Sequence, residues 1–185
     1  MNITVYLAST YANDESFTDS VRKFGTWLGR NGHRLIYGGS KRGLMGELAE
    51  SVLRNGGSVI GVEPEMFVNM GLLYEEIDEL IVTKDIAERR RKMIELGEAF
   101  IAFPGGTGTL EEISEIISMV ALGQLHAPCI LCNLSGYYDD LKKQLEKMID
   151  SGLSSRERLA GVSFVNSVEE AISIIESNPK NTEIG

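Results

Sequence analysis

Short apolar runs alternate with longer amphipathic stretches along the whole chain, and this rhythm restricts the folds that it can adopt. The short runs have the length and composition of β-strands, and the stretches between them carry apolar residues at helical spacing. Strands are expected at residues 3–8, 34–37, 58–62, 79–83, 99–103, 128–132 and 162–165. Helices are expected at residues 16–31, 44–55, 85–96, 109–122, 138–151 and 168–177.

The strand-like runs are apolar at successive positions rather than at every second one, as in Leu35-Ile-Tyr37 and Phe100-Ile-Ala-Phe103. Such strands are typical of a parallel sheet that helices cover on both sides. We therefore expect an α/β fold of the Rossmann-like, doubly wound kind, with a mainly parallel sheet and helices on both faces. With 185 residues, the chain is predicted to form one domain over residues 1–176 and a frayed tail at 177–185.

The turns between these elements carry local signals. Asn55-Gly-Gly57 is typical of a helix end, and Ser167 with Glu170 has the spacing of an N-terminal capping box. Residues 63–78, with Pro64 and several methionines, show no clear period. We expect that segment to be an irregular loop.

The charge of the chain limits its partners. It has 18 Lys+Arg and 27 Asp+Glu, a net charge of −9, whereas sequence-independent nucleic-acid binding needs a basic surface. No apolar run is long enough to span a bilayer, and the first ten residues lack the pattern of a signal peptide. The expectation is a cytoplasmic protein with neither nucleic acid nor membrane as a partner.

Cys129 and Cys132 have the C-x-x-C spacing found in redox and zinc sites. They lie in a run predicted to be a buried strand, where residues three apart point to opposite faces. Zinc needs about four ligands, and His126 is the only other obvious ligand nearby. We expect two buried thiols, no metal and no cofactor.

Three loops that leave predicted strands have unusual sequences, and ligands of open parallel sheets bind beyond these strand ends. The loops are Ala8-Ser-Thr10, Tyr37-Gly-Gly-Ser-Lys-Arg-Gly-Leu-Met-Gly46 and Phe103-Pro-Gly-Gly-Thr-Gly-Thr-Leu-Glu-Glu112. Glycines before a helix let backbone N–H groups approach an anion, and the helix N-terminus adds about half a positive charge. The third loop matches neither a Walker A motif nor G-x-G-x-x-G, which favours a phosphate ligand of mononucleotide size.

The third loop also has simpler interpretations. Its glycines can form a tight turn without a ligand, and Glu112 has capping-box spacing from Thr109, so it can accept a hydrogen bond from that residue's amide. A carboxylate beside an anion site is electrostatically unfavourable, however, and such groups tend to have a chemical task. These alternatives stay open at the level of the sequence.

The basic run Glu88-Arg-Arg-Arg-Lys92 lies on the helix before the same strand. Successive helical residues are about 100° apart, so one or two of these side chains at most can face a pocket. The rest are expected to lie on a solvated face.

Three ordered motifs resemble the lonely-guy family of phosphoribohydrolases that activate cytokinins, whose members are often labelled lysine decarboxylases. They are Tyr37-Gly-Gly with Gly43-Leu-Met-Gly46, then Glu88-Arg89, then Pro104-Gly-Gly-x-Gly-Thr-x-x-Glu112. Gly57-x-Val-Ile-Gly-Val62 and Gly136-Tyr-Tyr-Asp139 extend the similarity to nearly the whole chain. The family's Arg-Lys pair is Arg89-Arg90 here, and Ser40 stands in place of a third glycine.

The resemblance implies a homodimer that hydrolyses the N-glycosidic bond of a purine nucleoside 5′-monophosphate, such as AMP or a cytokinin nucleotide. The products would be the free base and ribose 5-phosphate. It assigns catalysis to Arg89, fifteen residues before Pro104, and to Glu112. It assigns substrate binding to the phosphate loop and to residues of the other loops: Gly105, Gly106, Thr107, Gly108 and Thr109, with Ser9, Gly39, Ser40, Met45 and Arg90.

The chemistry of this cleavage suits a carboxylate. Breaking a ribosyl C–N bond gives the sugar oxocarbenium character, and Glu112 can either stabilise that charge or activate the attacking water. The alternative from another class is a non-catalytic carrier of a nucleotide or of the molybdenum cofactor on the same fold. Lysine decarboxylation is not expected, because no lysine has a recognisable pyridoxal-phosphate setting.

Overall fold

Seven parallel strands form one sheet in the computed structural model, which describes residues 1–68, 70–71 and 74–177. Their order is β4-β3-β2-β1-β5-β6-β7, and every described pair of neighbours is parallel. The strands are β1 (Asn2–Tyr6), β2 (Arg34–Tyr37), β3 (Ser58–Pro64), β4 (Glu79–Thr83), β5 (Ala99–Ala102), β6 (Cys129–Cys132) and β7 (Val162–Val165). The mainly parallel sheet expected from the sequence is confirmed.

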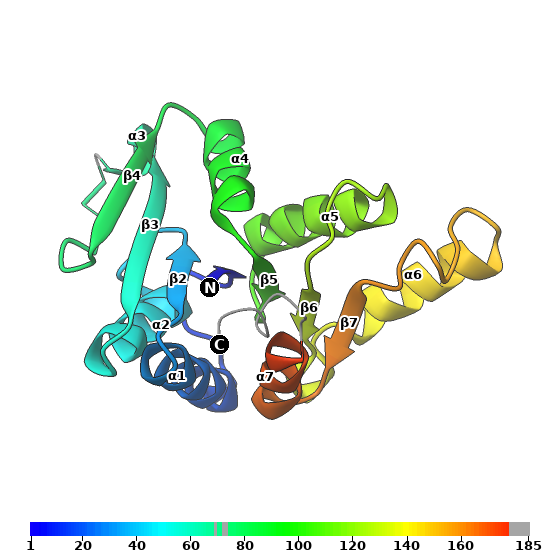
Figure 1. The fold of residues 1–185 in the computed structure, drawn as a ribbon, viewed down its shortest axis with the longest axis horizontal. Helices are drawn as coiled ribbons and strands as arrows, with labels where there is room; N and C mark the ends of the chain where they lie inside the picture. The colour runs from blue at the N-terminus through cyan, green and yellow to red at the C-terminus, as the bar shows by residue number, and fades with distance from the viewer. Residues whose placement is uncertain (69, 72–73, 178–185) are drawn as a thin grey trace.

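The strand order reverses at the centre of the sheet. From β1 the chain builds outward through β2 and β3 to β4, and then returns to place β5 on the other side of β1 (Figure 1). The loops that leave β1 and β5 therefore separate in opposite directions. In open α/β sheets, this switch point is where ligands bind.

Helices cover both faces of the sheet, as expected (Figure 1). α1 (Glu15–Arg30), α2 (Gly43–Arg54) and α7 (Val168–Glu176) pack into one core, and α4 (Ile86–Leu96), α5 (Thr107–Ala121) and α6 (Asp139–Asp150) pack into the other. Strands with two buried faces explain the uninterrupted apolar runs of the sequence. Cys129 and Cys132 illustrate this arrangement, since each thiol is buried in a different core.

Several helix ends follow from local side chains. Asp14 and Asp85 each accept a hydrogen bond from a backbone amide at the start of α1 and α4. Ser167 caps α7 through the Glu170 amide, as the capping-box spacing predicted. Glycine at position 56 has φ +80, so the predicted end of α2 is also confirmed.

The structure differs from the expectations in three main places. β1 ends at Tyr6 rather than at residue 8. Part of segment 63–78 is regular, because β3 continues to Pro64 and the short helix α3 (Glu65–Val68) follows it. α5 begins at Thr107 rather than at residue 109.

Two further observations concern the chain as a whole. No helix in the described ranges is both long and apolar enough to cross a bilayer. Ser177 still hydrogen-bonds to α7 through Ser173, and residues 178–185 of the predicted frayed tail lie outside the described residues.

Candidate functional site

A cleft of about 410 Å³ lies at the carboxyl ends of β1, β2, β3 and β5, over the switch point. Its lining comes from the loops after β1 and β2, from the end of β3, from single residues of α2, α3 and α4, and from the N-cap and first turns of α5. Its walls are Leu7, Ala8, Ser9, Thr10, Gly38, Ser40, Met45, Glu63, Phe67, Arg89, Gly106, Thr107, Gly108, Thr109 and Glu112. Ser40, Glu63, Thr109 and Glu112 are buried polar side chains, so the cleft is a polar site inside an apolar core.

The N-terminus of α5 faces this cleft without a side-chain cap. Its N-cap is Gly106, and among the described residues no side chain caps the amides of the first turn. Uncapped amides and the helix dipole together make a binding site for an anion such as phosphate.

The glycines of this loop do more than allow a tight turn. Only Gly105 is required by packing, because a Cβ there would overlap the Thr109 side chain. Gly106 and Gly108 have negative φ values and open space around them, so the turn itself would accept larger residues. Both line the cleft, where a side chain would occupy the space next to the amides. The simple-turn interpretation therefore explains only one of the three glycines.

Arg89 and Glu112 form a buried ion pair at the centre of the cleft. Arg89 Nη1 lies 3.1 Å from Glu112 Oε1, and the two side chains are 12% and 6% exposed. Arg89 Nε donates a hydrogen bond of 3.0 Å to the carbonyl oxygen of Val62. A Cβ at Gly38 would overlap the guanidinium, so this glycine lets Arg89 lie against the β2 loop.

The capping-box interpretation of Glu112 is wrong. α5 begins two residues earlier than predicted, which places Thr109 within the helix and not at its cap. The Glu112 side chain then points to Arg89 rather than back to the helix end. Burial raises the pKa of Glu112, and the neighbouring Arg89 opposes this effect.

A second carboxylate, Glu63 at the end of β3, completes the charged part of the cleft. Its Oε2 lies 4.0 Å from Arg89 Nε, and its side chain is 5% exposed. Burial raises the pKa of Glu63 to about 7, with Arg89 lowering it and Glu112 raising it. Sequence reasoning missed this residue, although a carboxylate that ends an apolar strand of a parallel sheet was a usable signal.

Most of the residues expected to bind substrate line the same cleft: Ser9, Ser40, Met45, Gly106, Thr107, Gly108 and Thr109. Gly39, Gly105 and Arg90 do not. The Arg90 guanidinium pairs with Glu111 and with Glu115 (2.9 Å), so it joins α4 to α5 outside the cleft.

Two tyrosines support the glycine loop from behind. The Tyr137 hydroxyl donates a hydrogen bond to the carbonyl oxygen of Gly105, and the Tyr138 hydroxyl donates one of 2.7 Å to that of Phe103. Asn133 Oδ1 in turn accepts a hydrogen bond of 2.6 Å from the Tyr138 amide. The Gly136-Tyr-Tyr-Asp139 motif thereby fixes the backbone from which α5 starts.

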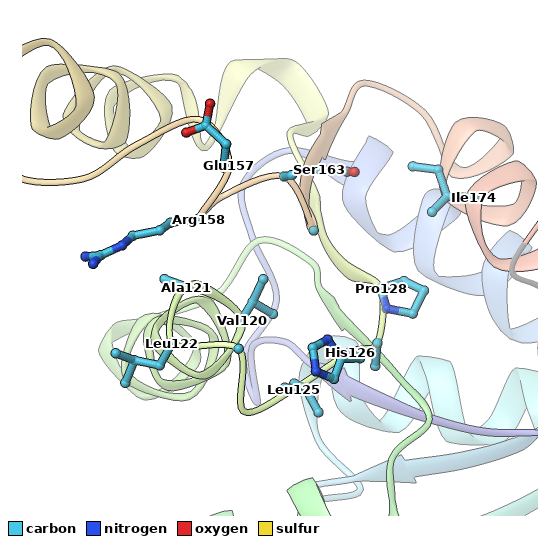
Figure 2. A pocket seen from close by; sticks show the side chains of 14 residues that line it. Val120, Ala121, Leu122, Leu125, His126, Pro128, Glu157, Arg158, Ser163 and Ile174 are labelled. Carbon is cyan, nitrogen blue, oxygen red and sulfur yellow. The ribbon is translucent and has the colours of Figure 1, made fainter.

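A larger cavity of about 740 Å³ lies at the opposite end of the sheet (Figure 2). It is formed by the C-terminal end of α5 and by the segments that lead into β6 and β7, around His126, Pro128 and Ser163. None of the residues that line it is a buried polar or charged side chain. The smaller cleft at the carboxyl ends of the strands is therefore the candidate active site.

Comparison with known proteins shows the family of this chain. A family model described as "Possible lysine decarboxylase" matches residues 45–175. A cytokinin riboside 5′-monophosphate phosphoribohydrolase of Rhodococcoides fascians is 35% identical over 177 residues, which cover 95% of this chain and 89% of that protein. The chain belongs to the lonely-guy family.

Plant members of the lonely-guy family are similar to the same degree. Cytokinin riboside 5′-monophosphate phosphoribohydrolase LOG1 of Arabidopsis thaliana is 36% identical over 153 residues, 83% of this chain and 72% of that protein. Among solved structures, the molybdenum cofactor binding protein of Rippkaea orientalis has a TM-score of 0.70 at 23% identity and covers 95% of both chains. The likeness to that binding protein shows the fold alone.

Proposed function

We propose that this protein hydrolyses the N-glycosidic bond of a purine nucleoside 5′-monophosphate and releases the base and ribose 5-phosphate. The observation that carries the proposal is the buried Arg89–Glu112 pair beside the uncapped N-terminus of α5. The helix N-terminus offers a phosphate site, and the pair holds a carboxylate close to it. The similarity to named phosphoribohydrolases supports the same reaction.

In this proposal the 5′-phosphate binds at the N-terminus of α5, and the ribose lies over Glu112. As the C–N bond breaks, the Glu112 carboxylate stabilises the oxocarbenium-like sugar and accepts a proton from the attacking water. A charge pair about 4 Å apart at an effective dielectric near 20 contributes about 4 kcal/mol before desolvation, or about three decades in rate.

Arg89 favours the ionised form of that carboxylate and holds it in place. Its Nη1 and Nε are used by Glu112 and by the carbonyl of Val62, which fixes the plane of the guanidinium. Its remaining N–H groups are available to the substrate, where the positive charge offsets that of the phosphate. We assign the direct substrate contacts to Ser9, Ser40, Met45 and the turn from Gly106 to Thr109, and supporting roles to Gly39, Gly105 and Arg90.

The assay of this proposal uses purified protein with AMP and with N6-isopentenyl AMP, and separates free base from nucleotide by chromatography. We expect base release that Glu112→Gln reduces by roughly 10³-fold without unfolding the protein. The ratio of the two rates measures recognition of the N6 side chain. A folded Glu112→Gln protein with wild-type turnover would contradict the proposal.

Nucleotide binding without any turnover would favour a carrier. Lysine decarboxylation has less support, because no lysine is among the residues that line the cleft. Incubation with pyridoxal phosphate and lysine is expected to give neither an aldimine absorbance nor CO₂.

We also propose a cytoplasmic homodimer, on the strength of the family resemblance. Exposed apolar side chains at both ends of α5, Leu110 and Leu122, are available for such a contact, whereas Ile116 is buried in the core of its own subunit. Light scattering on the purified protein will distinguish a dimer from a monomer.

A further inference from the structure

The Glu63 carboxyl faces the cleft without a hydrogen-bond donor from the described residues. It is buried at the end of β3, and its one charged neighbour of opposite sign is Arg89, at 4.0 Å. The same guanidinium lies closer to Glu112, at 3.1 Å. Glu63 is therefore the more weakly paired of two carboxylates that share one cation, and weaker pairing favours its protonated form.

The strand order indicates which part of a substrate reaches Glu63. The cleft extends from the phosphate site at the start of α5 across the ends of β1 and β2 to β3. Glu63 and Phe67 form its far end. Neighbouring strands are about 4.8 Å apart, so this path crosses roughly 14 Å. A nucleoside monophosphate with its phosphate at α5 and its ribose at Glu112 places its base toward β3.

We propose that Glu63 is the general acid that protonates the departing purine base. This inference rests on the proposed function and adds a second catalytic carboxyl to it. A purine leaves poorly as an anion, and a positioned acid that supplies the proton removes this difficulty.

The proposed step breaks the bond between the ribose and the base and adds water to the sugar. The C1′–N9 bond breaks and its electron pair stays with the base, while the Glu63 carboxyl gives its proton to a ring nitrogen of that base. Water adds its oxygen to C1′ and gives one proton to Glu112. The products are the neutral purine and ribose 5-phosphate, and exchange with solvent returns the proton from Glu112 to Glu63.

The surroundings of Glu63 decide the pH range of this step. The charged and titratable groups that face it are Arg89 from α4, Glu112 from α5 and Tyr37 from β2. Burial and the charge of Glu112 raise the pKa of Glu63 to about 7, and Arg89 lowers it. Because the acid works only when protonated, turnover of a purine nucleotide falls as the pH rises above about 7.

The test compares two substrates that differ in the leaving group. One is AMP, and the other is 4-nitrophenyl ribofuranoside 5-phosphate, whose nitrophenolate departs without a proton. We expect Glu63→Gln to lower kcat on AMP by roughly 10²-fold and to leave kcat on the nitrophenyl substrate within about threefold. Glu112→Gln slows both substrates. Glu47→Gln, which changes a carboxylate paired with Arg22 outside the cleft, slows neither.

The pH profile of the wild-type enzyme supplies a readout that needs no variant. The alkaline fall in kcat is expected with AMP and is absent with the nitrophenyl substrate, which carries the same phosphate group. If Glu63→Gln lowers kcat equally on both substrates, or on neither, Glu63 is not the general acid. Wild-type protein that hydrolyses neither substrate would instead refute the proposed function, and the two failures are thereby distinguished.

Discussion

At the scale of single residues, the site depends on how one guanidinium is held. Arg89 comes from α4, but its partners are the Val62 carbonyl on β3, the Glu112 carboxylate on α5 and the open backbone at Gly38 after β2. A strand, a helix and a loop that are distant in sequence thus fix one side chain. A change that displaces the guanidinium also displaces the carboxylate paired with it.

Gly38→Ala tests this dependence. The added Cβ overlaps Arg89, so the guanidinium must move, and we expect kcat to fall roughly 10²-fold as the pair leaves its position. Binding of ribose 5-phosphate, measured by calorimetry, should change little, because the amides of α5 are untouched. Wild-type kcat in this variant would show that the position of Arg89 is not critical.

The sequence pointed to the pair Arg89 and Glu112 through its resemblance to a known family, whereas Glu63 was missed. Attention to loops of unusual sequence led to the ends of β1, β2 and β5, whereas Glu63 lies within β3, a strand that was predicted to end at residue 62. A buried charge has no sequence signature of its own, because burial depends on which strands become neighbours. Only the sheet order places Glu63 beside Arg89.

At the scale of elements, the proposed function assigns a phosphate site and a catalytic residue to one helix, α5. Its first turn offers free amides, and Glu112 lies little more than one turn further on. The predicted start of this helix was two residues late, and two helical residues correspond to about 200° of rotation. Because Thr109 lies within α5, the capping alternative for Glu112 fails, and the Glu112 carboxylate pairs with Arg89 instead.

Replacing Gly106 shows what the uncapped end of α5 is for. Gly106→Asp and Gly106→Asn both offer a capping oxygen, and each should stabilise the protein by a few tenths of a kcal/mol. The aspartate also places a negative charge where the phosphate binds, so it should weaken ribose 5-phosphate binding by tenfold or more relative to asparagine, on the order of 1.4 kcal/mol. Equal affinities for the two variants would argue against phosphate binding at this end.

At the scale of the whole molecule, the charges of the cleft affect folding. The folded protein holds a proton on Glu63 up to about pH 7, whereas an unfolded chain releases it near the ordinary value of 4.5. Between these values the folded state binds more protons, so the free energy of unfolding falls as the pH rises. The carboxylate is therefore kept in the cleft at a cost to stability at neutral and alkaline pH.

Denaturant unfolding at pH 5 and at pH 8 measures this cost. In the wild type, Glu63 should lower the free energy of unfolding by on the order of 3 kcal/mol between these two pH values. This decrease should be absent in Glu63→Gln and present in Glu47→Gln. The variant is thus expected to be more stable than the wild type at pH 8 and less active on AMP. An unchanged pH dependence of unfolding would mean that Glu63 is ionised throughout this range.

The central pairing of β1 with β5 also has a consequence for how the protein is made. Ile3 pairs with Ala99, so one edge of the first strand has no partner until nearly a hundred residues have followed it. Pairings between such distant segments form slowly, and an unpaired apolar edge invites association with other chains. During synthesis, the N-terminal strands must therefore remain soluble until β5 emerges from the ribosome. We expect the cleft, whose two walls flank that pairing, to be among the last parts of the molecule to form.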